Sequence, residues 1–489
     1  MNGIWIDRLA EAAVPALSYA VLGYMGLATL FYFFLLLVAG NKLVREKETR
    51  HLRNDDVLHQ SHAPPLSILV PAYNEELNIV SSVRSLLSIN YRTYEIIVVN
   101  DGSKDATTEK MIEEFAMVPL TSKIHWSGLR KETKPVRAVY RSRTHPNLIL
   151  IDKENGGKAD ALNVGINASR YPYFVSLDGD TVLDPDAFIN IMKPITEAKP
   201  GEDIIATGGS VGIANGSFVD SGYLQVGDVV LSNNPLVVMQ VIEYLRAFLV
   251  GRIALSELNL LLIVSGAFGV FRKDWVIEAG GYEVGTIGED MELIVRLHRR
   301  IKEKRSGARI VYVPDPVCWT EAPESAKYLR RQRVRWHRGL FESLWKHRRM
   351  ILNPRYGAIG LVAMPYYVFV ELLAPLLEFV GYATAVAGWA FGGRYVQFSL
   401  LLTAALIVYG SLLSMGSVLF EEWSMKRYTR LSDTARMFVY ALSESFWYRP
   451  LMTVWRLEGF IQAVRGKRHG WGEMARKGSI AGSKRKGAK

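Results

Sequence analysis

Short apolar runs alternate with amphipathic stretches across the middle of the chain, between residues 65 and 350. Apolar runs that end in turn residues predict strands, and apolar residues at helical spacing predict helices. The predicted strands lie within LSILVPAYNEE (66–76), YEIIVVNDGS (94–103), NLILIDKENGG (147–157) and YFVSLDGDT (173–181). The predicted helices are 77–89, 105–115 and 158–169. This alternation predicts βαβ units, and therefore an α/β domain with a mostly parallel sheet.

Three long apolar stretches flank this domain. Residues 12–41 and 395–420 contain no Asp, Glu, Lys or Arg, and residues 356–393 carry only two carboxylates. About 20 helical residues, each rising about 1.5 Å, cross the ~30 Å hydrocarbon core of a bilayer. We therefore expect an integral membrane protein. Residues 437–464 mix apolar with charged residues, which predicts an interfacial or re-entrant segment.

The pattern divides the chain into five zones. They are an N-terminal transmembrane helix (1–41), a charged cytosolic linker (42–64), the α/β domain (65–350), transmembrane and interfacial helices (351–464) and a basic cytosolic tail (465–489). Lys42, Arg45 and Lys47 follow the first apolar stretch directly. Because basic residues accumulate on the cytosolic side of membrane helices, we expect the α/β domain in the cytosol.

Net charge changes this picture little. The chain carries +11, but residues 465–489 hold nine Lys or Arg and one Glu, so the tail accounts for +8. The tail is predicted to be solvated and to touch the anionic lipid bilayer. The basic residues have no interleaved aromatic platform and no helix-turn-helix pattern, so we expect no nucleic acid partner. The single cysteine, Cys318, excludes an internal disulfide and a cysteine-rich metal site.

Carboxylates and one lysine follow several predicted strands, at the end where ligands bind in α/β sheets. Asp178 and Asp180 are two residues apart, so an extended backbone projects both from one face, where Mg²⁺ or Mn²⁺ is a suitable ligand. A solvated turn explains the Asp-Gly-Asp sequence equally well. Asp101 ends another strand in turn residues. Lys158 follows two glycines at a predicted helix start, a position suited to a diphosphate.

Two further motifs have both a structural and a chemical interpretation. Glu289 and Asp290 open a basic amphipathic helix, where acidic residues commonly cap the first turn. Gln332, Arg335 and Trp336 lie at i, i+3 and i+4, so they share one helix face that can hold a ligand. The same arginine-rich segment is also typical of a helix in the membrane interface.

In order, the motifs VPAYNEE, NDGS, GGKADALN, DGD, SGAFGVFR, GED and QRVRW, flanked by membrane helices, resemble those of the family 2 processive membrane glycosyltransferases. This family includes cellulose, hyaluronan and poly-N-acetylglucosamine synthases, and the resemblance covers roughly residues 20–470. It implies a GT-A nucleotide-sugar transferase domain on the cytosolic face of the inner (plasma) membrane, in a multi-pass protein. It also implies a UDP-sugar donor, Mg²⁺ or Mn²⁺, a growing β-linked polysaccharide acceptor and a possible export partner.

The resemblance implies a role for each candidate site residue. A uridine pocket would be lined by Ala72, Tyr73 and Glu75, with Asp101 accepting a hydrogen bond from the uracil. Lys158 would sit by the diphosphate, Asp178 would contact the nucleotide, and Asp180 would bind the metal. Asp290 would be the general base, beside Glu289 as a substrate-binding residue. The acceptor sugar would meet a wall at residues 264–271, including Ser265 and Gly266. The diphosphate and the acceptor sugar would both be held by Gln332, Arg335 and Trp336.

The chemistry of inverting sugar transfer agrees with these roles. The leaving diphosphate develops negative charge, which a metal ion together with Lys158 and Arg335 would stabilise. The acceptor hydroxyl must lose a proton to one positioned carboxylate, which the resemblance places at Asp290. Gly288 stands where cellulose synthases carry threonine, which argues against cellulose as the product. The sequence does not name the sugar.

Two alternative functions remain open at this point, and so does the role of two carboxylates in an apolar stretch. A non-processive enzyme that transfers one sugar to a polyprenyl-phosphate lipid would share the same donor site, and a non-enzymatic membrane scaffold would keep the domain without its chemistry. Glu371 and Glu378 lie seven residues apart on one helical face of an apolar stretch. Because membrane carboxylates face a bundle interior or an aqueous path, they either line a polysaccharide channel or pair with arginines of the interfacial helices.

Overall fold

A computed structural model describes residues 2–50, 63–120, 126–178, 181–184, 186–217, 219–220, 223–224, 229–391 and 395–466. Asp180, residues 51–62 of the predicted linker and residues 467–489 of the predicted tail lie outside this part of the chain. The predictions made for them therefore stay predictions.

One twelve-stranded sheet organises the α/β domain, in the order β3-β4-β5-β2-β1-β6-β11-β8-β12-β7-β10-β9. The four strands predicted from the sequence are parallel neighbours at its centre, in the order β5 (Leu148–Lys153), β2 (Tyr94–Asp101), β1 (Leu66–Ala72) and β6 (Tyr173–Leu177). Their Val, Ile and Leu side chains are almost all buried, as expected where helices cover both faces of a parallel sheet.

The remaining strands make the sheet mixed rather than parallel throughout. β11 (Phe268–Arg272) runs antiparallel between β6 and β8 (Ile204–Ile213), and β12 (Arg309–Thr320) runs parallel to β8. The edge strands are β3 (Met117–Pro119), β4 (Val136–Ser142), β7 (Val182–Leu183), β9 (Val219–Asp220) and β10 (Tyr223–Leu224). The parallel prediction holds for the central strands, where the helical crossovers are visible in the sequence.

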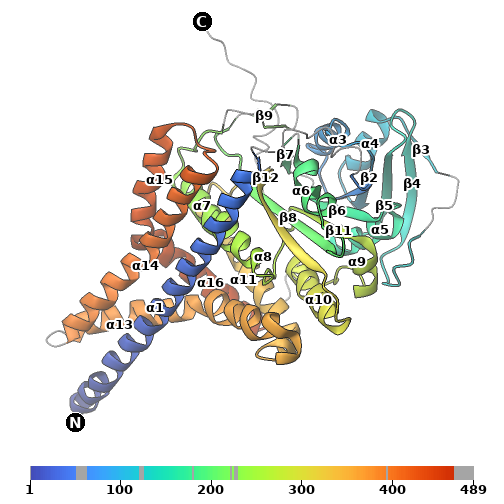
Figure 1. The fold of residues 1–489 in the computed structure, drawn as a ribbon. Helices are drawn as coiled ribbons and strands as arrows, with labels where there is room; N and C mark the ends of the chain where they lie inside the picture. Colours follow the sequence, from blue (N-terminus) through green and yellow to red (C-terminus); the bar gives the residue numbers. More distant parts are fainter. Residues whose placement is uncertain are drawn as a thin grey trace, which may run out of the picture.

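Helices cover both faces of the sheet, with α3, α4 and α6 above it and α5, α9 and α10 below it in Figure 1. The three helices predicted from spacing are found at the expected places, as α3 (Ile79–Leu87), α4 (Thr107–Glu114) and α5 (Lys158–Ala168). The others are α6 (Ala187–Thr196), α9 (Lys273–Ala279) and α10 (Glu289–Glu303).

Three helices of the described chain are long and apolar enough to cross a membrane, over Ala13–Glu46, Ile359–Ala390 and Val396–Ser424. They match the three apolar stretches of the sequence. They belong to α1 (Asn2–Arg50), to the run of η4 (Ile359–Ala363), α12 (Met364–Tyr366), η5 (Tyr367–Leu372) and α13 (Ala374–Phe391), and to α14 (Tyr395–Ser424). Figure 1 shows α1, α13 and α14 extending together away from the sheet.

The predicted interfacial segment forms two consecutive helices that pack on different partners. α15 (Leu431–Ser443) and α16 (Tyr448–Val464) are joined by η6 (Glu444–Phe446), and this turn packs against the middle of α14. Ser445 Oγ donates a hydrogen bond to the carbonyl oxygen of Ile407 at 3.2 Å. The other connecting helices are α7 (Pro235–Tyr244), η1 (Leu245–Arg252), α8 (Ile253–Glu257), α11 (Ala326–Lys346), η2 (Arg348–Met350) and η3 (Pro354–Tyr356). α15 packs on α14 and α7, and α16 packs on α11 and α13.

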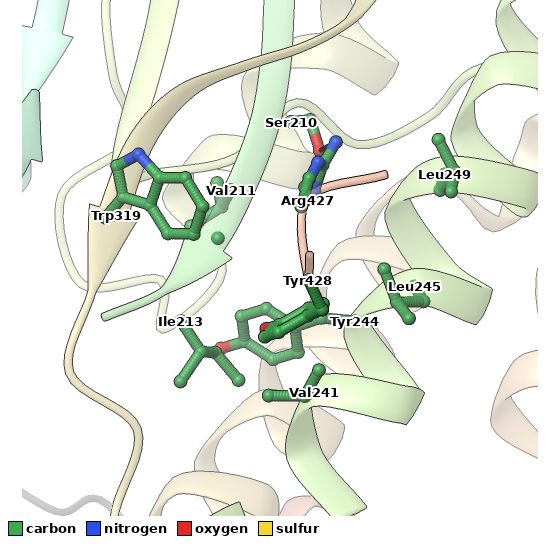
Figure 2. A pocket seen from close by; sticks show the side chains of 11 residues that line it. Ser210, Val211, Ile213, Val241, Tyr244, Leu245, Leu249, Trp319, Arg427 and Tyr428 are labelled. Atoms are coloured by element: carbon green, nitrogen blue, oxygen red, sulfur yellow. Dashed lines mark hydrogen bonds between the residues drawn. The ribbon is translucent and has the colours of Figure 1, made fainter. Parts of the chain in front are cut away.

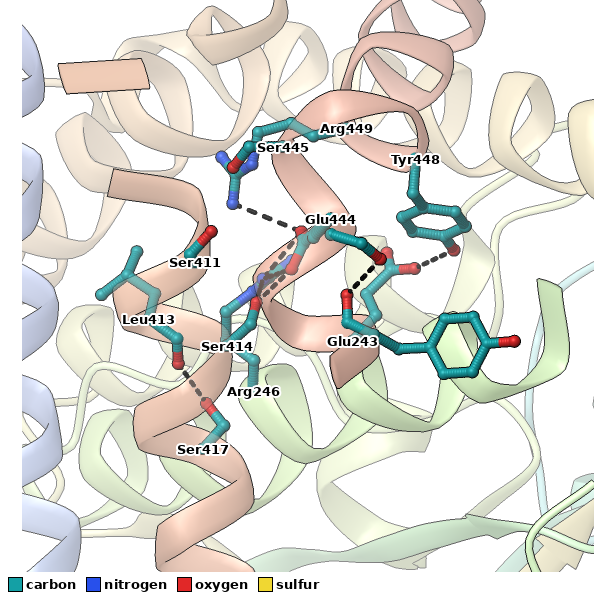
Figure 3. A network of polar contacts seen from close by, with 12 residues as sticks. Glu243, Arg246, Ser411, Leu413, Ser414, Ser417, Glu444, Ser445, Tyr448 and Arg449 are labelled. Atoms are coloured by element: carbon teal, nitrogen blue, oxygen red, sulfur yellow. Dashed lines mark hydrogen bonds and ion pairs between the residues drawn. The ribbon is translucent and has the colours of Figure 1, made fainter. Parts of the chain in front are cut away.

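Buried ion pairs connect η6 and α16 to η1 and to the apolar helix α13 (Figure 3). Glu444 accepts hydrogen bonds from Arg246 of η1 at 3.1 Å and from Ser414 of α14. Arg449 of α16 lies 2.9 Å from Glu378 and 3.5 Å from Glu444. Burying a lone charge among apolar helices is costly, so each carboxylate is matched by an arginine.

Glu371 is satisfied in the same way. It lies 3.7 Å from Arg456 of α16 and accepts hydrogen bonds from Tyr32 at 3.2 Å and Tyr366 at 2.9 Å. Both Glu371 and Glu378 therefore pair with arginines of α16. Of the two alternatives that the sequence left open for these carboxylates, the structure shows the ion pairs with arginines.

Candidate active site

The carboxyl ends of β1, β2, β5 and β6 meet at one edge of the sheet, and most of the predicted site residues lie there. Ala72 ends β1 and is paired in register with the residue before Asp101, which ends β2. Tyr73 follows with 39% of its surface exposed, and the backbone N–H of Glu75 donates to Thr107 Oγ1 at 3.0 Å. These four residues therefore lie close together, at and just after the carboxyl ends of β1 and β2. Their role in binding a uridine stays a prediction.

Asp101 is buried, and its carboxylate is engaged by the protein itself. Lys153 Nζ lies 2.6 Å from Oδ1, and the backbone N–H of Gly156 donates to the same atom at 3.0 Å. The N–H of Gly157 donates to Oδ2 at 2.7 Å. The loop that precedes α5 is thus tied to the end of β2. The hydrogen bond that Asp101 would accept from a uracil stays a prediction.

Lys158 is the centre of the polar cluster. It is the first residue of α5, and its Nζ lies 2.5 Å from Asp178 Oδ1 and 3.9 Å from Glu289 Oε1. It also donates a hydrogen bond to the carbonyl oxygen of Gly266 at 3.1 Å. Burial alone would lower the pKa of Lys158, but Asp178 and then Glu289 outweigh it and raise that pKa above its ordinary value. The lysine is therefore a permanent cation.

A small cavity opens beside this lysine. Its lining residues are Lys158, Leu162, Ser176, Ser265, Gly266, Phe271, Tyr282, Glu289 and Asp290. Burial and, after it, the adjacent Asp290 raise the pKa of Glu289 to about 7, against the opposing effect of Lys158. Residues far apart in the sequence, from 158–162, 265–271 and 282–290 together with Ser176, thus supply one cavity that holds a cation beside a carboxyl group with a raised pKa. A perturbed pKa of this kind is characteristic of functional sites.

The helix with the QRVRW motif packs directly on the start of α10. A Cβ atom added to Gly288 would lie 3.0 Å from the carbonyl oxygen of Gly339, so the two backbones touch. Ser343 Oγ donates to the carbonyl oxygen of Gly288 at 3.2 Å, and the N–H of Ile287 donates to Glu342 at 3.1 Å. Position 339 lies on α11, one turn after the motif, so the packing brings the motif close to the acidic end of α10.

The three predicted residues of the motif do not line the cavity. Gln332 and Arg335 are half-buried, and Trp336 has 41% of its surface exposed. The buried Arg333, which the sequence did not single out, lies 4.5 Å from the Trp336 ring centroid and 2.9 Å from Glu243 of α7. A cation–π contact of this kind fixes the ring. The motif therefore lies outside the cavity, on the helix that packs against the start of α10.

A second cavity lies where the membrane helices join the sheet (Figure 2), and no predicted site residue lines it. The rings of Tyr244, Trp319 and Tyr428 surround it. Arg427, from the segment after α14, donates to Ser210 Oγ and to the carbonyl oxygen of Pro314, both at 3.3 Å. These contacts fasten the end of α14 to β8 and β12. The cavity is thus part of a joint between the membrane helices and the sheet.

The cluster at Lys158 has the chemistry that a divalent cation requires. Asp178, Glu289 and Asp290 present three carboxyl groups to one ammonium, which leaves an excess of negative charge and oxygen donors of the type that Mg²⁺ and Mn²⁺ prefer. Within the described residues, no three His, Cys, Asp or Glu side chains are placed to hold a metal together. The predicted ligand Asp180 is outside them, so the residues fit a cation without defining its position.

Comparison with known proteins identifies the family. A family model described as "Glycosyl transferase family 2" matches residues 67–215, and one described as "Glycosyl transferase family group 2" matches residues 173–418, half of the chain. The chain is a family 2 glycosyltransferase. The matched ranges contain the strand ends, the lysine loop and the motif helix described above.

Relatives of this glycosyltransferase include polysaccharide synthases. It is 30% identical over 282 residues to the poly-beta-1,6-N-acetyl-D-glucosamine synthase of Staphylococcus aureus (strain COL), with 57% of this chain and 55% of the relative covered. It is 29% identical over 324 residues to the enzyme of the same name from Staphylococcus epidermidis, with 66% and 63% covered. The glycosyltransferase thus spans between about half and two thirds of the length of these relatives.

A solved structure shows the fold. The mannosyltransferase from Pyrobaculum calidifontis, determined in complex with GDP-Man and Mn²⁺, superposes with a TM-score of 0.50 and 19% sequence identity, covering 89% of this chain and 99% of that one. The glycosyltransferase therefore has the GT-A fold, as the sequence predicted. Its three apolar helices and its synthase relatives make it a membrane-associated enzyme.

Proposed function

We propose that this glycosyltransferase transfers a sugar from a UDP-sugar, with inversion, to a growing β-linked polysaccharide. N-acetylglucosamine is the sugar that we propose first, because the staphylococcal relatives are named for its polymer. The observation that carries the proposal is the cluster at Lys158, where a cation, three carboxyl groups and a cavity meet at the carboxyl edge of the sheet. The diphosphate of a nucleotide sugar needs a nearby cation. An attacking hydroxyl needs one carboxylate that accepts its proton.

In this proposal, the nucleotide-sugar donor and the acceptor sugar contact different residues of the site. Ala72, Tyr73, Glu75 and Asp101 would hold the nucleoside at the ends of β1 and β2. The ammonium of Lys158 would contact the diphosphate, since it is held at the first turn of α5, where the helix dipole also favours an anion. Asp178 would orient that ammonium through their 2.5 Å ion pair.

Asp290 is the proposed general base. One of its carboxylate oxygens accepts the N–H of Met291 at 2.8 Å, and the other faces Gly266 across the cavity. The lack of a side chain at Gly266 leaves room for an acceptor sugar to approach that oxygen. Removing the proton from the acceptor hydroxyl as it attacks C1 would convert an α-linked donor into a β-linked product.

We propose that a divalent cation, Mg²⁺ or Mn²⁺, is bound by Asp180 with help from Asp178 and the diphosphate oxygens. When bound, such a cation neutralises charge on the leaving diphosphate. The rest of the stabilisation would come from the chain itself, through Lys158 and through Arg335 of the motif helix. Gln332 and Trp336 of the motif helix would hold the acceptor sugar on one side, and Ser265 of the cavity would contact it on the other.

The membrane organisation is also a proposal. The N-terminus would lie outside, the α/β domain in the cytosol, and the three apolar helices in the plasma membrane, with the zone boundaries given by the sequence pattern. The motif helix α11 contacts α16 and η5, so the proposed acceptor residues on it would lie close to the apolar helices. Such an arrangement would couple synthesis to export, with or without a separate export partner.

The test is an assay of the purified full chain in lipid nanodiscs, supplied with UDP-N-acetylglucosamine and Mg²⁺ or Mn²⁺. The proposal predicts UDP release together with a product of many sugars that a β-specific hydrolase degrades. A product of one sugar on a polyprenyl-phosphate lipid would support the non-processive alternative, and the same donor site would explain it. The absence of UDP release with every UDP-sugar tested would contradict the proposal.

A further inference from the structure

Lys153 is a lysine outside every motif, and its side chain has no exposed surface. Lysines are almost never fully buried unless they are paired. Here Nζ lies 2.6 Å from Asp101 Oδ1 and 2.6 Å from Asp160 Oδ2, and it donates to the carbonyl oxygen of Glu154 at 2.5 Å. One ammonium is therefore shared by two buried carboxylates at the end of β5.

Both carboxylates also contact the loop in front of Lys158, one through hydrogen bonds and the other through close packing. Asp101 accepts the backbone N–H groups of Gly156 and Gly157, at 3.0 and 2.7 Å. Asp160 lies in the first turn of α5, and a Cβ atom on Gly156 would overlap its carboxylate. The loop before the site lysine is thus held by hydrogen bonds to one of the two acids that Lys153 neutralises, and it packs against the other.

The loop depends on these contacts for its shape. Gly157 has a φ of 91°, in the region that glycine adopts freely and other residues rarely do. Glycine loses the most conformational freedom when it is ordered, so this segment would sample other conformations if its hydrogen bonds were lost. The bonds in turn depend on Asp101 staying charged and in place, next to a second buried carboxylate.

We propose that Lys153 is a positioning residue, which sets where Lys158 presents its ammonium to the donor diphosphate. The inference rests on the proposed function, because it takes Lys158 as the diphosphate contact. Without the ammonium of Lys153, Asp101 and Asp160 would face each other as two unpaired buried carboxylates. One of them must then take up a proton or move away, and either change loosens the loop.

A purely structural role for Lys153 makes a different prediction. A lysine that only stabilises the core would lower the thermal midpoint when it is removed, and folded protein would bind UDP normally. A positioning residue acts through Lys158, so its removal should have no further effect on UDP affinity once that side chain is gone. A double-mutant cycle separates the two roles.

The experiment measures UDP affinity by titration calorimetry on the full chain in nanodiscs with Mg²⁺. Lys158→Met is expected to weaken UDP binding about tenfold or more, and Lys153→Met by a similar factor. The double variant should bind no more than about twofold more weakly than Lys158→Met alone. Lys153→Arg, which keeps the charge, should recover most of the affinity.

Lys273→Met is the matched control. Lys273 is also partly buried and donates to Ser127 and Ser169, but it lies at the opposite, amino-terminal edge of the central strands. Its loss should leave UDP affinity unchanged. If Lys153→Met does not fold, the variant that combines Lys153→Met with Asp160→Asn takes its place, because it removes one carboxylate together with the cation. The cycle then combines that variant with Lys158→Met.

Each outcome decides between the roles. Normal UDP affinity in folded Lys153→Met, or effects of the two lysine substitutions that multiply in the double variant, would overturn the inference and leave the proposed function standing. Normal UDP affinity in Lys158→Met would instead overturn the proposed diphosphate contact, and with it the basis of the inference. Loss of affinity in both single variants without further loss in the double supports it.

Discussion

The contact between Gly288 and Gly339 should be sensitive to a single added methyl group. In Gly288→Ala, the new Cβ would lie 3.0 Å from the carbonyl oxygen of Gly339 and 3.1 Å from its Cα. Both neighbours are backbone atoms, so a helix has to move by a few tenths of an ångström. Overpacking of this kind costs about 1–3 kcal/mol. Because Asp290 lies two residues further on, the movement is expected to displace the proposed base.

The expected result is a loss of turnover with little loss of donor binding. Small misplacements of reacting groups can cost up to about a hundredfold in rate, and we expect kcat for sugar transfer in Gly288→Ala to fall at least about tenfold. UDP affinity should stay within about threefold, because Lys158 and Asp101 are not carried by α10. The assay is UDP release by the purified variant in nanodiscs, with calorimetry for UDP.

Two glycine controls sharpen the test. Gly307→Ala adds a Cβ that meets nothing within 4 Å, and it should leave kcat unchanged. Gly339→Ala adds a Cβ 3.0 Å from the backbone nitrogen of Gly288, so it should reproduce the loss of turnover. Alanine is favoured over glycine inside a helix by up to about 1 kcal/mol, which acts in the opposite direction. Wild-type kcat in both Gly288→Ala and Gly339→Ala would refute the reasoning.

Three further results are expected. Arg449→Leu leaves Glu378 and Glu444 without their shared cation, so it should cost about 3–5 kcal/mol and lower the thermal midpoint followed by size exclusion; an unchanged midpoint would show that the pairs contribute nothing. Burial lowers the pKa of His298 to about 4, so only the unfolded chain takes up a proton between pH 6.5 and 4. The thermal midpoint should fall as the pH drops through that range, and less steeply in His298→Asn; equal slopes would contradict the assignment. EDTA should abolish transfer and Mg²⁺ or Mn²⁺ restore it, whereas activity that persists in EDTA would exclude the proposed cation.

The sequence was sufficient for the features with a strong local signal. The central parallel strands, the helices α3, α4 and α5 and the three apolar helices all follow from hydrophobic spacing, and the structure has them where they were expected. The antiparallel strand β11 was not predicted as such, because the direction of a strand depends on the path of the chain between strands and not on its residues.

The site was predictable as a set of motifs and less so as a geometry. The sequence indicated that Lys158, Glu289 and Asp290 share one site, and they do line one cavity. It gave no sign that Lys153, or Arg333 within the QRVRW motif, is buried, since lysine and arginine side chains are ordinarily exposed. Their importance comes from burial next to Asp101, Asp160 and Glu243, which only the tertiary structure shows.

The central claim is that Asp290 removes the proton from the acceptor while the donor is held by other residues. Asp290→Asn keeps the size of the side chain and removes its basicity, so it isolates this role. The deciding measurement compares sugar transfer and UDP affinity in the wild-type and Asp290→Asn proteins, in the same nanodiscs and with the same metal. The account predicts that transfer falls by at least about a hundredfold, since general-base catalysis contributes about 10²–10⁴-fold, while UDP affinity changes less than about twofold. Retained transfer, or loss of UDP binding in Asp290→Asn, would contradict it.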